Sequence, residues 1–147
     1  MKSFSRRKLR VLTDQEFLLK HARNPSHSGD TRSLALQGSC KNPLCGDNVE
    51  VGIDLSEGAI SQIRIQASGC GISTASASLM SEIVKGKTVG EAFSALDVFN
   101  NSLLSKTDWP DEIALLKPFQ RLRESPTRIP CALIGWFALK DALEPAR

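Results

Sequence analysis

Three cysteines and one aspartate stand at positions where they could do chemistry together. Cys45 and Asp47 lie two residues apart in the stretch NPLCGD, and the glycine between them permits a tight turn. Cys70 lies between two glycines, where a strand should end and a helix begin. Cys131 directly follows a proline in the first turn of a predicted helix. Because helix N-termini favour thiolate over thiol, Cys70 and Cys131 lie where a cysteine becomes a nucleophile or a metal ligand.

Three thiolates and one carboxylate form a set of four ligands. Tetrahedral zinc accepts such a set, and so could an iron–sulfur cluster, which thiolates usually hold. The nearest cations in sequence are Lys41 and Arg128. The spacing contains no CxxC pair, and free cysteine is among the most buried residue types. The pattern alone therefore leaves a second interpretation open, in which Cys70 and Cys131 are ordinary buried side chains.

Other residues that could do chemistry give weaker indications of a functional site. We interpret Cys40, in the same stretch CKNPLCGD, as a loop thiol without a role in the site. His21 and His27 lie in or beside a Gly/Pro loop and are expected to be solvated. No histidine–acid pair stands at a usable position beside the serines of GISTASAS, so we expect these small residues to permit close helix packing; they are Ser73, Ser76 and Ser78.

Composition sets the class of protein in which such a site would lie. The 147 residues are 41% hydrophobic and 24% charged, which suits one compact domain. We expect a basic N-terminus over residues 1–12 and a single domain over 13–147. Net charge is only +3, so a nucleic-acid surface has little support, and no apolar run is long enough to span a bilayer. Four cysteines without a signal-peptide pattern favour the cytoplasm and reduced thiols over a disulfide framework.

Local patterns predict the elements that must position the four side chains. Thr13 with Glu16 reads as a capping box that opens a helix through about residue 20. Alternation of apolar and polar residues predicts a short strand over 33–37 and an antiparallel hairpin that pairs 49–53 with 63–67. Helical spacing predicts a helix from 73 to 85, a second capping box at Thr88 and Glu91, and a last, nearly all-apolar helix from 130. Between them, Asp108 is a candidate helix cap and Pro118 a predicted break.

The order is helix, small antiparallel sheet, then a run of helices. This order predicts an α+β fold with the helices packed on one face of the sheet.

Several motifs of the chain resemble one known family. NPLCGD (42–47), GCGISTASAS (69–78), GKT (86–88) and RIPC (128–131) occur in the order seen in U-type iron–sulfur assembly proteins. This family includes the IscU scaffolds, the N-terminal part of NifU, and SufU. The resemblance covers residues 21 to 143 and is closest to SufU, because Pro130 stands where IscU scaffolds carry a histidine.

The resemblance implies a ligand set of Cys45, Asp47, Cys70 and Cys131, with Arg128 as a supporting residue. It implies an α+β fold, zinc as the bound metal, and a cysteine desulfurase as the sulfur-donating partner. The alternative that it implies is a scaffold for a [2Fe–2S] cluster, which recipient apo-proteins then take over. Whether the chain is itself an enzyme, a sulfurtransferase, is left open.

On the sulfur-transfer interpretation, Cys45 is our candidate for the accepting thiol, because it lies on the loop richest in glycine and proline. Asp47, as the only oxygen ligand, would tune how readily the site opens. A hypothesis of another class is a structural zinc module that only binds partners. The pattern gives no expectation for the oligomeric state.

Overall fold

A three-stranded antiparallel sheet forms one side of the molecule, in the order β1-β2-β3. The computed structural model describes residues 12–105 and 107–147. Of the predicted basic N-terminus, everything before Leu12 lies outside the described residues. The strands are β1 (Leu36–Asn42), β2 (Asp47–Ser56) and β3 (Ala59–Ser68). The predicted hairpin is confirmed, with Val51 paired to Ile65 and Ile53 to Ile63.

Four α-helices and four 3₁₀ segments are the helical elements of the described chain. The α-helices are α2 (Asp14–Arg23), α3 (Gly71–Val84), α4 (Val89–Leu104) and α5 (Ile129–Leu143). The 3₁₀ segments are η1 (Thr31–Ser33), η2 (Asp111–Glu124), η3 (Pro126–Arg128) and η4 (Glu144–Ala146). Within the described ranges, no helix is long and apolar enough to cross a membrane.

Both predicted capping boxes are present. In the first, Thr13 Oγ1 accepts the Glu16 N–H at 3.1 Å, and the Glu16 carboxylate accepts the Thr13 N–H at 3.0 Å. The second, between Thr88 and Glu91, has the same reciprocal pattern at 3.1 and 2.9 Å. Each box satisfies two N–H groups that a helix start otherwise leaves unpaired, which fixes where α2 and α4 begin.

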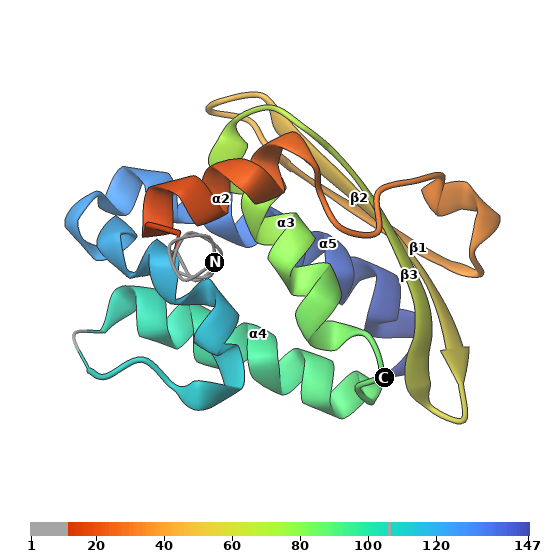
Figure 1. The fold of residues 1–147 in the computed structure, drawn as a ribbon. Coiled ribbons are helices and arrows are strands. Elements are labelled where there is room, and N and C mark those ends of the chain that lie inside the picture. Colours follow the sequence, from red (N-terminus) through yellow and green to blue (C-terminus); the bar gives the residue numbers. More distant parts are fainter. Residues whose placement is uncertain (1–11, 106) are drawn as a thin grey trace, which may run out of the picture.

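The helices cover one face of the sheet, as the α+β prediction requires (Figure 1). α5 lies against β1 and β2, α3 lies against β3, and α4 with η2 packs behind them. α2 crosses α3 on the outside. The core lies between these layers; its largest fully buried side chains include Trp136, Phe99, Phe119, Ile53 and Ile63.

The contact between α5 and β1 depends on the absence of a side chain at Gly38. A Cβ there would collide with the backbone of α5 at Ala138 and Ala142. The helix can therefore lie directly on the strand. This close approach holds Cys131, in the first turn of α5, near the end of β1.

Three of the sequence predictions were wrong in detail. β1 begins at Leu36 rather than at residue 33 and continues to Asn42, so Cys40 lies in a strand and not in a loop. Pro118 lies within η2, and the backbone departs from helical geometry at Ile113 instead. η2 begins directly after Pro110, which stands at the N-cap position without a side-chain hydrogen bond, so Asp108 is not its cap. The cause at Pro118 is physical: a 3₁₀ segment is stabilised by i→i+3 bonds and tertiary packing, so a proline interrupts it less than it would an α-helix.

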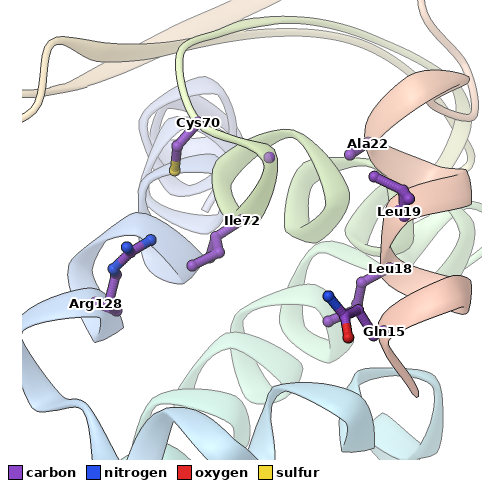
Figure 2. A pocket seen from close by; sticks show the side chains of 8 residues that line it. Gln15, Leu18, Leu19, Ala22, Cys70, Ile72 and Arg128 are labelled. Carbon is purple, nitrogen blue, oxygen red and sulfur yellow. The ribbon is translucent and has the colours of Figure 1, made fainter. Parts of the chain in front are cut away.

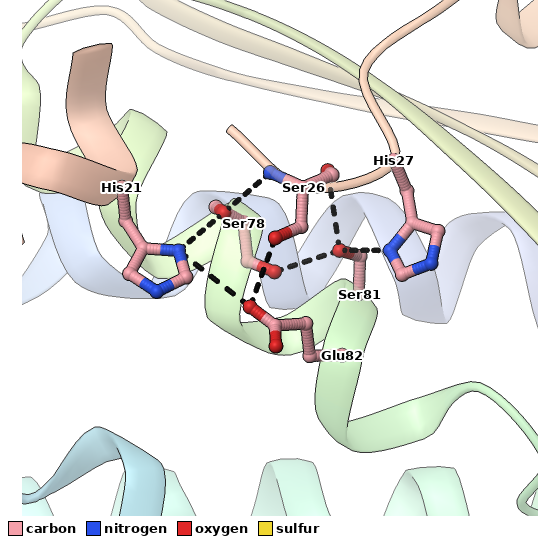
Figure 3. A network of polar contacts seen from close by, with 6 residues as sticks. All are labelled: His21, Ser26, His27, Ser78, Ser81 and Glu82. Atoms are coloured by element: carbon pink, nitrogen blue, oxygen red, sulfur yellow. Dashed lines mark hydrogen bonds and ion pairs between the residues drawn. The ribbon is translucent and has the colours of Figure 1, made fainter. Parts of the chain in front are cut away.

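The expectation of solvated histidines was also wrong. His21 Nδ1 lies 2.7 Å from Ser78 Oγ, and His27 Nδ1 lies 2.9 Å from Ser81 Oγ (Figure 3). We call the six side chains drawn there the histidine–serine network; they are His21, Ser26, His27, Ser78, Ser81 and Glu82. The network fastens α2 and the loop after it to the middle of α3.

Candidate metal centre

The turn between β1 and β2 presents Cys45 and Asp47 on one side of the chain. Asn42 Oδ1 accepts the Leu44 N–H at 3.1 Å, and the Asn42 carbonyl accepts the Gly46 N–H at 2.8 Å. Gly46 has a φ of +72°, a conformation that glycine adopts without steric cost. The Cys45 side chain is consequently exposed at the turn, whereas Asp47, at the start of β2, is only 1% exposed.

The other two cysteines approach Asp47 from the starts of two helices. Cys70 is the N-cap residue of α3 and is half-buried, and Cys131 is the third residue of α5 and is buried. Gly69 makes the approach of Cys70 possible. Its φ is +122°, and a Cβ at that position would lie 2.8 Å from the Asp47 Cα and collide with the carboxylate.

Four hydrogen-bond donors converge on the Asp47 carboxylate. Oδ1 accepts the backbone N–H of Cys70 at 2.8 Å. Oδ2 accepts the hydroxyl of Ser73 at 2.7 Å, the thiol of Cys45 at 3.1 Å and the thiol of Cys70 at 3.2 Å. Asp47 is therefore the common point of the β1–β2 turn and the start of α3.

Cys131 completes the group of predicted ligands. Its Sγ lies 3.7 Å from the Cys45 Sγ. One ligand atom from each of Cys45, Asp47 and Cys131 lies within 4.8 Å of the others; the fourth residue, Cys70, joins this group through its contact with Asp47. The structure thus brings together all four residues that the sequence singled out.

The donor set fits a tetrahedral metal. With Zn–S bonds of about 2.3 Å and Zn–O bonds of about 2.1 Å, two sulfurs of one zinc site lie about 3.8 Å apart, and sulfur and oxygen about 3.6 Å apart. The distance of 3.7 Å between Cys45 and Cys131 matches the first value. The sulfur–oxygen distances at Asp47, 3.1 and 3.2 Å, are shorter by a few tenths of an ångström, as hydrogen bonds through a proton would be. Cys45, Asp47 and Cys131 are thus close to the spacing of a tetrahedral site, whereas Cys70, which lies outside this group of three, would have to move to join it.

The local environment moves two pKa values in opposite directions. Burial alone would raise the pKa of Asp47, but the hydrogen bonds from Ser73, the Cys70 amide and the two thiols outweigh it and lower that pKa to about 2. Burial, with the neighbouring Cys45 and Cys70 thiols, raises the pKa of Cys131 to about 12. The expected thiolate preference at a helix start is thus overcome at Cys131 by burial. A metal would have to displace this proton when it binds.

Two residues beside the predicted ligands were not recognised from the sequence. Ser73 was expected only to permit packing, yet it donates the shortest hydrogen bond to Asp47. Asn42 shapes the turn and places its side-chain amide 3.9 Å from the Cys131 Sγ. The signal for Ser73 was its position three residues after Cys70, one helical turn into α3.

A mostly apolar cavity of about 260 Å³ opens beside Cys70, between α2 and the start of α3 (Figure 2). Leu18 and Leu19 of α2 and Ile72 of α3 contribute to its lining. Arg128, the predicted supporting residue, also lines it and is exposed, with its side chain directed toward the space beneath Cys70. Arg128 therefore lies next to the centre, at the edge of the cavity.

Cys40 lies apart from the donor group. It is half-buried on β1, where it is paired with Val49 of β2, and it packs against the hydrophobic core. Burial, then the nearby Asp141 carboxylate, raises its pKa. All four cysteines of the chain are free thiols in the structure. The interpretation of Cys40 as a thiol outside the site agrees with this placement.

Comparison with known proteins shows which family and which relatives this chain resembles in sequence. Residues 13–145 match the family described as NifU-like N terminal domain. The chain is 30% identical over 131 residues to the zinc-dependent sulfurtransferase SufU of Bacillus subtilis (strain 168), covering 88% of each chain. It is 32% identical over 126 residues to the iron–sulfur cluster assembly scaffold protein IscU of Streptococcus pyogenes serotype M1, covering 84% of this chain and 78% of that protein.

A solved structure has the same fold. The N-terminal part of a nitrogen-fixing NifU-like protein from Brucella abortus superimposes with a TM-score of 0.80, over 87% of this chain and 90% of the other, at 24% sequence identity. The antiparallel sheet with helices on one face is therefore shared with that structure.

Proposed function

The chain belongs to the NifU-like N-terminal domain family, and from this premise we propose that it is an iron–sulfur cluster assembly protein that binds zinc and accepts sulfur from a cysteine desulfurase. The observation that carries the proposal is the meeting of three thiols, from three separate segments, at one buried carboxylate. The relative named as a zinc-dependent sulfurtransferase, 30% identical over most of the chain, supports the same metal and the same activity.

The proposed zinc ligands are Cys45, Asp47, Cys70 and Cys131. Zinc at this position would keep the sulfurs deprotonated at neutral pH and protect them from oxidation. The chain's own contribution is to hold Cys45, Asp47 and Cys131 within 4.8 Å of one another before metal arrives: the β1–β2 turn fixes Cys45, and the start of α5 fixes Cys131.

We assign the accepting role to Cys45, because it is the most exposed of the three sulfurs at the centre. Its thiolate attacks the outer sulfur of the persulfide on the desulfurase. A new sulfur–sulfur bond forms at Cys45 while the bond inside the donor persulfide breaks. The desulfurase cysteine leaves as a thiolate, and the proton of the persulfide travels with the transferred sulfur. The products are a persulfide on Cys45 and a desulfurase ready for another cycle.

Leu44 gives this turn a second feature suited to a protein partner. Its side chain is 92% exposed beside Cys45, at the tip of the turn. A desulfurase that reaches Cys45 would cover this leucine, which gains from burial in an interface. Recipient apo-proteins or other assembly proteins would receive the sulfur or the cluster afterwards. Free thiols in such a relay require a reducing compartment, and we propose the cytoplasm.

A [2Fe–2S] scaffold is the second candidate function, favoured by the 32% identity to an assembly scaffold protein. The same three thiolates and carboxylate could hold a cluster as cargo, since clusters are held mainly by thiolates. Anaerobic purification distinguishes the two functions. The zinc relay predicts a colourless protein with one zinc per chain, whereas the scaffold predicts a reddish protein with labile sulfide.

A structural zinc module that only binds partners makes a different prediction. It would unfold when a chelator removes the metal. We expect the metal-free chain to remain folded, because the hydrophobic core of the described residues is built from side chains other than the four proposed ligands. Circular dichroism before and after chelation measures this directly.

The decisive experiment is a sulfur-transfer assay. The zinc-loaded chain is incubated with a cysteine desulfurase and L-cysteine, and persulfides are trapped by alkylation and located by mass spectrometry. We expect one persulfide on Cys45, a faster desulfurase turnover, and loss of both in Cys45→Ser. Cys40→Ser serves as the matched control and should behave as the wild type. Normal sulfur acceptance by Cys45→Ser would remove Cys45 from this role, and no acceptance by the wild type would overturn the proposed function.

A further inference from the structure

We propose that Ser73 is a positioning residue for the metal centre, which fixes the orientation of the Asp47 carboxylate when metal occupies the site. The inference deepens the proposed function and rests on it. Ser73 lies in the first turn of α3, is fully buried, and places its hydroxyl 2.7 Å from Asp47 Oδ2.

Fewer donors remain available to Asp47 once a metal occupies the site. Two of the four, the thiols of Cys45 and Cys70, are themselves proposed ligands. A sulfur that binds a metal has given up its proton and no longer donates to the carboxylate. Two donors then remain, one for each oxygen: the Cys70 backbone N–H on Oδ1 and the Ser73 hydroxyl on Oδ2.

The two remaining donors orient the Asp47 carboxylate. The Cys70 amide is part of the backbone and ties Oδ1 to the start of α3. Ser73 alone among the remaining donors contacts Oδ2, the oxygen that faces the sulfurs of Cys45 and Cys70. Together the two bonds fix the plane of the carboxylate and turn Oδ2 toward the thiols. Hydrogen bonds to a ligating group orient it in the same way in other metal sites.

Solvent could not easily replace the Ser73 hydroxyl. Asp47 is 1% exposed and Ser73 is fully buried, so solvent has little access to replace a lost hydroxyl. The Ser73 Oγ also lies 3.4 Å from the Cys70 Sγ, so its hydroxyl reaches two of the proposed ligands from one rigid helical position. Removal of the hydroxyl would leave Oδ2 held by ligand thiols alone.

The chain offers a matched control in Ser76. Ser76 lies three residues later on the same helix and is equally buried, but its hydroxyl donates to the Ala132 carbonyl at 2.6 Å and not to Asp47. Ser73→Ala and Ser76→Ala therefore each remove one buried hydroxyl from α3. Only the first removes it from the proposed metal centre.

The test measures zinc affinity by competition with a chromophoric chelator, in wild type, Ser73→Ala and Ser76→Ala. We expect about a tenfold loss of affinity in Ser73→Ala, since loss of a partner of a metal ligand typically costs 10- to 100-fold. Ser76→Ala should stay within about twofold of wild type, because its hydroxyl contacts a backbone carbonyl, that of Ala132, and no ligand side chain. Cobalt(II) replaces zinc in a parallel series, where a changed visible absorption spectrum in Ser73→Ala reports an altered ligand geometry.

A double-mutant cycle separates positioning from general packing. If Ser73 acts through Asp47, then Ser73→Ala should cost less than about twofold in zinc affinity when Asp47 is already replaced by Ala. An undiminished loss in that background would overturn the proposal, and so would an equal loss in Ser76→Ala. A wild-type chain that binds no zinc would overturn the proposed metal centre itself, which is a distinct result from wild-type binding that Ser73→Ala leaves unchanged.

Discussion

Helix α3 carries two polar regions that are built from the same residue types and behave differently. At its start, Ser73 and the Cys70 amide and thiol all point to one carboxylate, Asp47. Two turns later, Ser78 and Ser81 serve the imidazoles of the histidine–serine network (Figure 3). Both regions bury serine hydroxyls against titratable side chains.

The difference lies in how donors and acceptors are balanced. In the network, Ser81 Oγ donates to the Ser78 carbonyl at 2.7 Å, and Ser78 Oγ receives the Ser26 N–H at 2.7 Å. Each of these hydroxyls and each imidazole Nδ1 there has at least one protein partner, although Ser78 Oγ and Ser81 Oγ serve more than one. At the metal centre, by contrast, three donors crowd on one oxygen of Asp47. The histidine–serine network needs no ligand to satisfy its polar groups, which suits a structural contact between α2 and α3. The Asp47 carboxylate would gain a stronger electrostatic partner if a cation replaced the thiol protons, which suits a binding site.

The largest effect is expected from Gly69→Ala. The new methyl group would meet Asp47 in a backbone conformation, φ +122°, that favours glycine. We expect a loss of about 3 kcal/mol in the free energy of unfolding and loss of tight zinc binding. Gly71→Ala is the matched control, because its methyl group meets only the Ala22 Cβ at 3.6 Å. Urea denaturation and chelator competition measure both, and a Gly69→Ala protein with wild-type zinc affinity would contradict the close packing at Asp47.

Ser78→Ala should destabilise the histidine–serine network and leave zinc binding at the candidate metal centre unchanged. It removes the acceptor of the Ser26 N–H and the partner of His21, at a position with no exposed surface. We expect a loss of about 1–3 kcal/mol in unfolding free energy, the usual cost of leaving buried polar groups unpaired. Zinc affinity should stay within about twofold of wild type. A large fall in affinity would mean that the two regions are coupled through α3.

A smaller effect is expected from pH, in different windows for the two regions. Burial lowers the pKa of His21 and of His27 below 6.5, so between the folded and unfolded values the unfolded chain binds more protons. Their contribution to stability is complete above pH 6.5 and declines as the pH falls below it. Asp47, with its pKa lowered from 3.8 to about 2, loses its contribution only below pH 3.8.

The measurement is the urea midpoint of the metal-free chain between pH 7.5 and 5. The wild type should become less stable over this range, and His21→Gln with His27→Gln should flatten the dependence. An unchanged slope in that double variant would show that these histidines do not carry it. The metal-free form is used because acid also releases metal from thiolates.

The smallest effect is expected from Cys40→Ala, which marks the boundary of the centre. Cys40 is only half-buried and packs on the inner face of β1. We expect an unchanged stoichiometry of one zinc per chain and a change in unfolding free energy within about 1 kcal/mol. Metal analysis after gel filtration measures the stoichiometry, and less than one zinc per chain would place Cys40 in the ligand set.

Much of this architecture could be predicted from sequence because the signals are local. The hairpin follows from alternation, and the starts of α2 and α4 follow from capping boxes that need only four residues each. The hairpin and the two capping boxes depend on neighbours in the chain. The four candidate ligand positions came from the motifs that resemble the U-type family, together with loop and helix-start context, and their metal-binding role stays a prediction.

The features that were missed depend on contacts between distant segments. Cys40 belongs to a strand because β1 pairs with β2, which no local pattern around it announces. The roles of Ser73 and of the two histidines depend on partners 26 to 57 residues away. The raised pKa of Cys131 reflects burial in the assembled fold, which overcame the local influence of the helix start.

The three sulfurs of the centre lie at three depths: Cys45 is exposed, Cys70 is half-buried and Cys131 is buried. On the side where Leu44 projects, the Cys45 sulfur is the one that a protein surface would meet first. Cys70 lines the apolar cavity beside the centre, and Cys131 has little contact with solvent. On the proposed function, a sulfur atom delivered to Cys45 would therefore arrive 3.7 Å from the deeply placed Cys131 sulfur, before any other part of the site holds it.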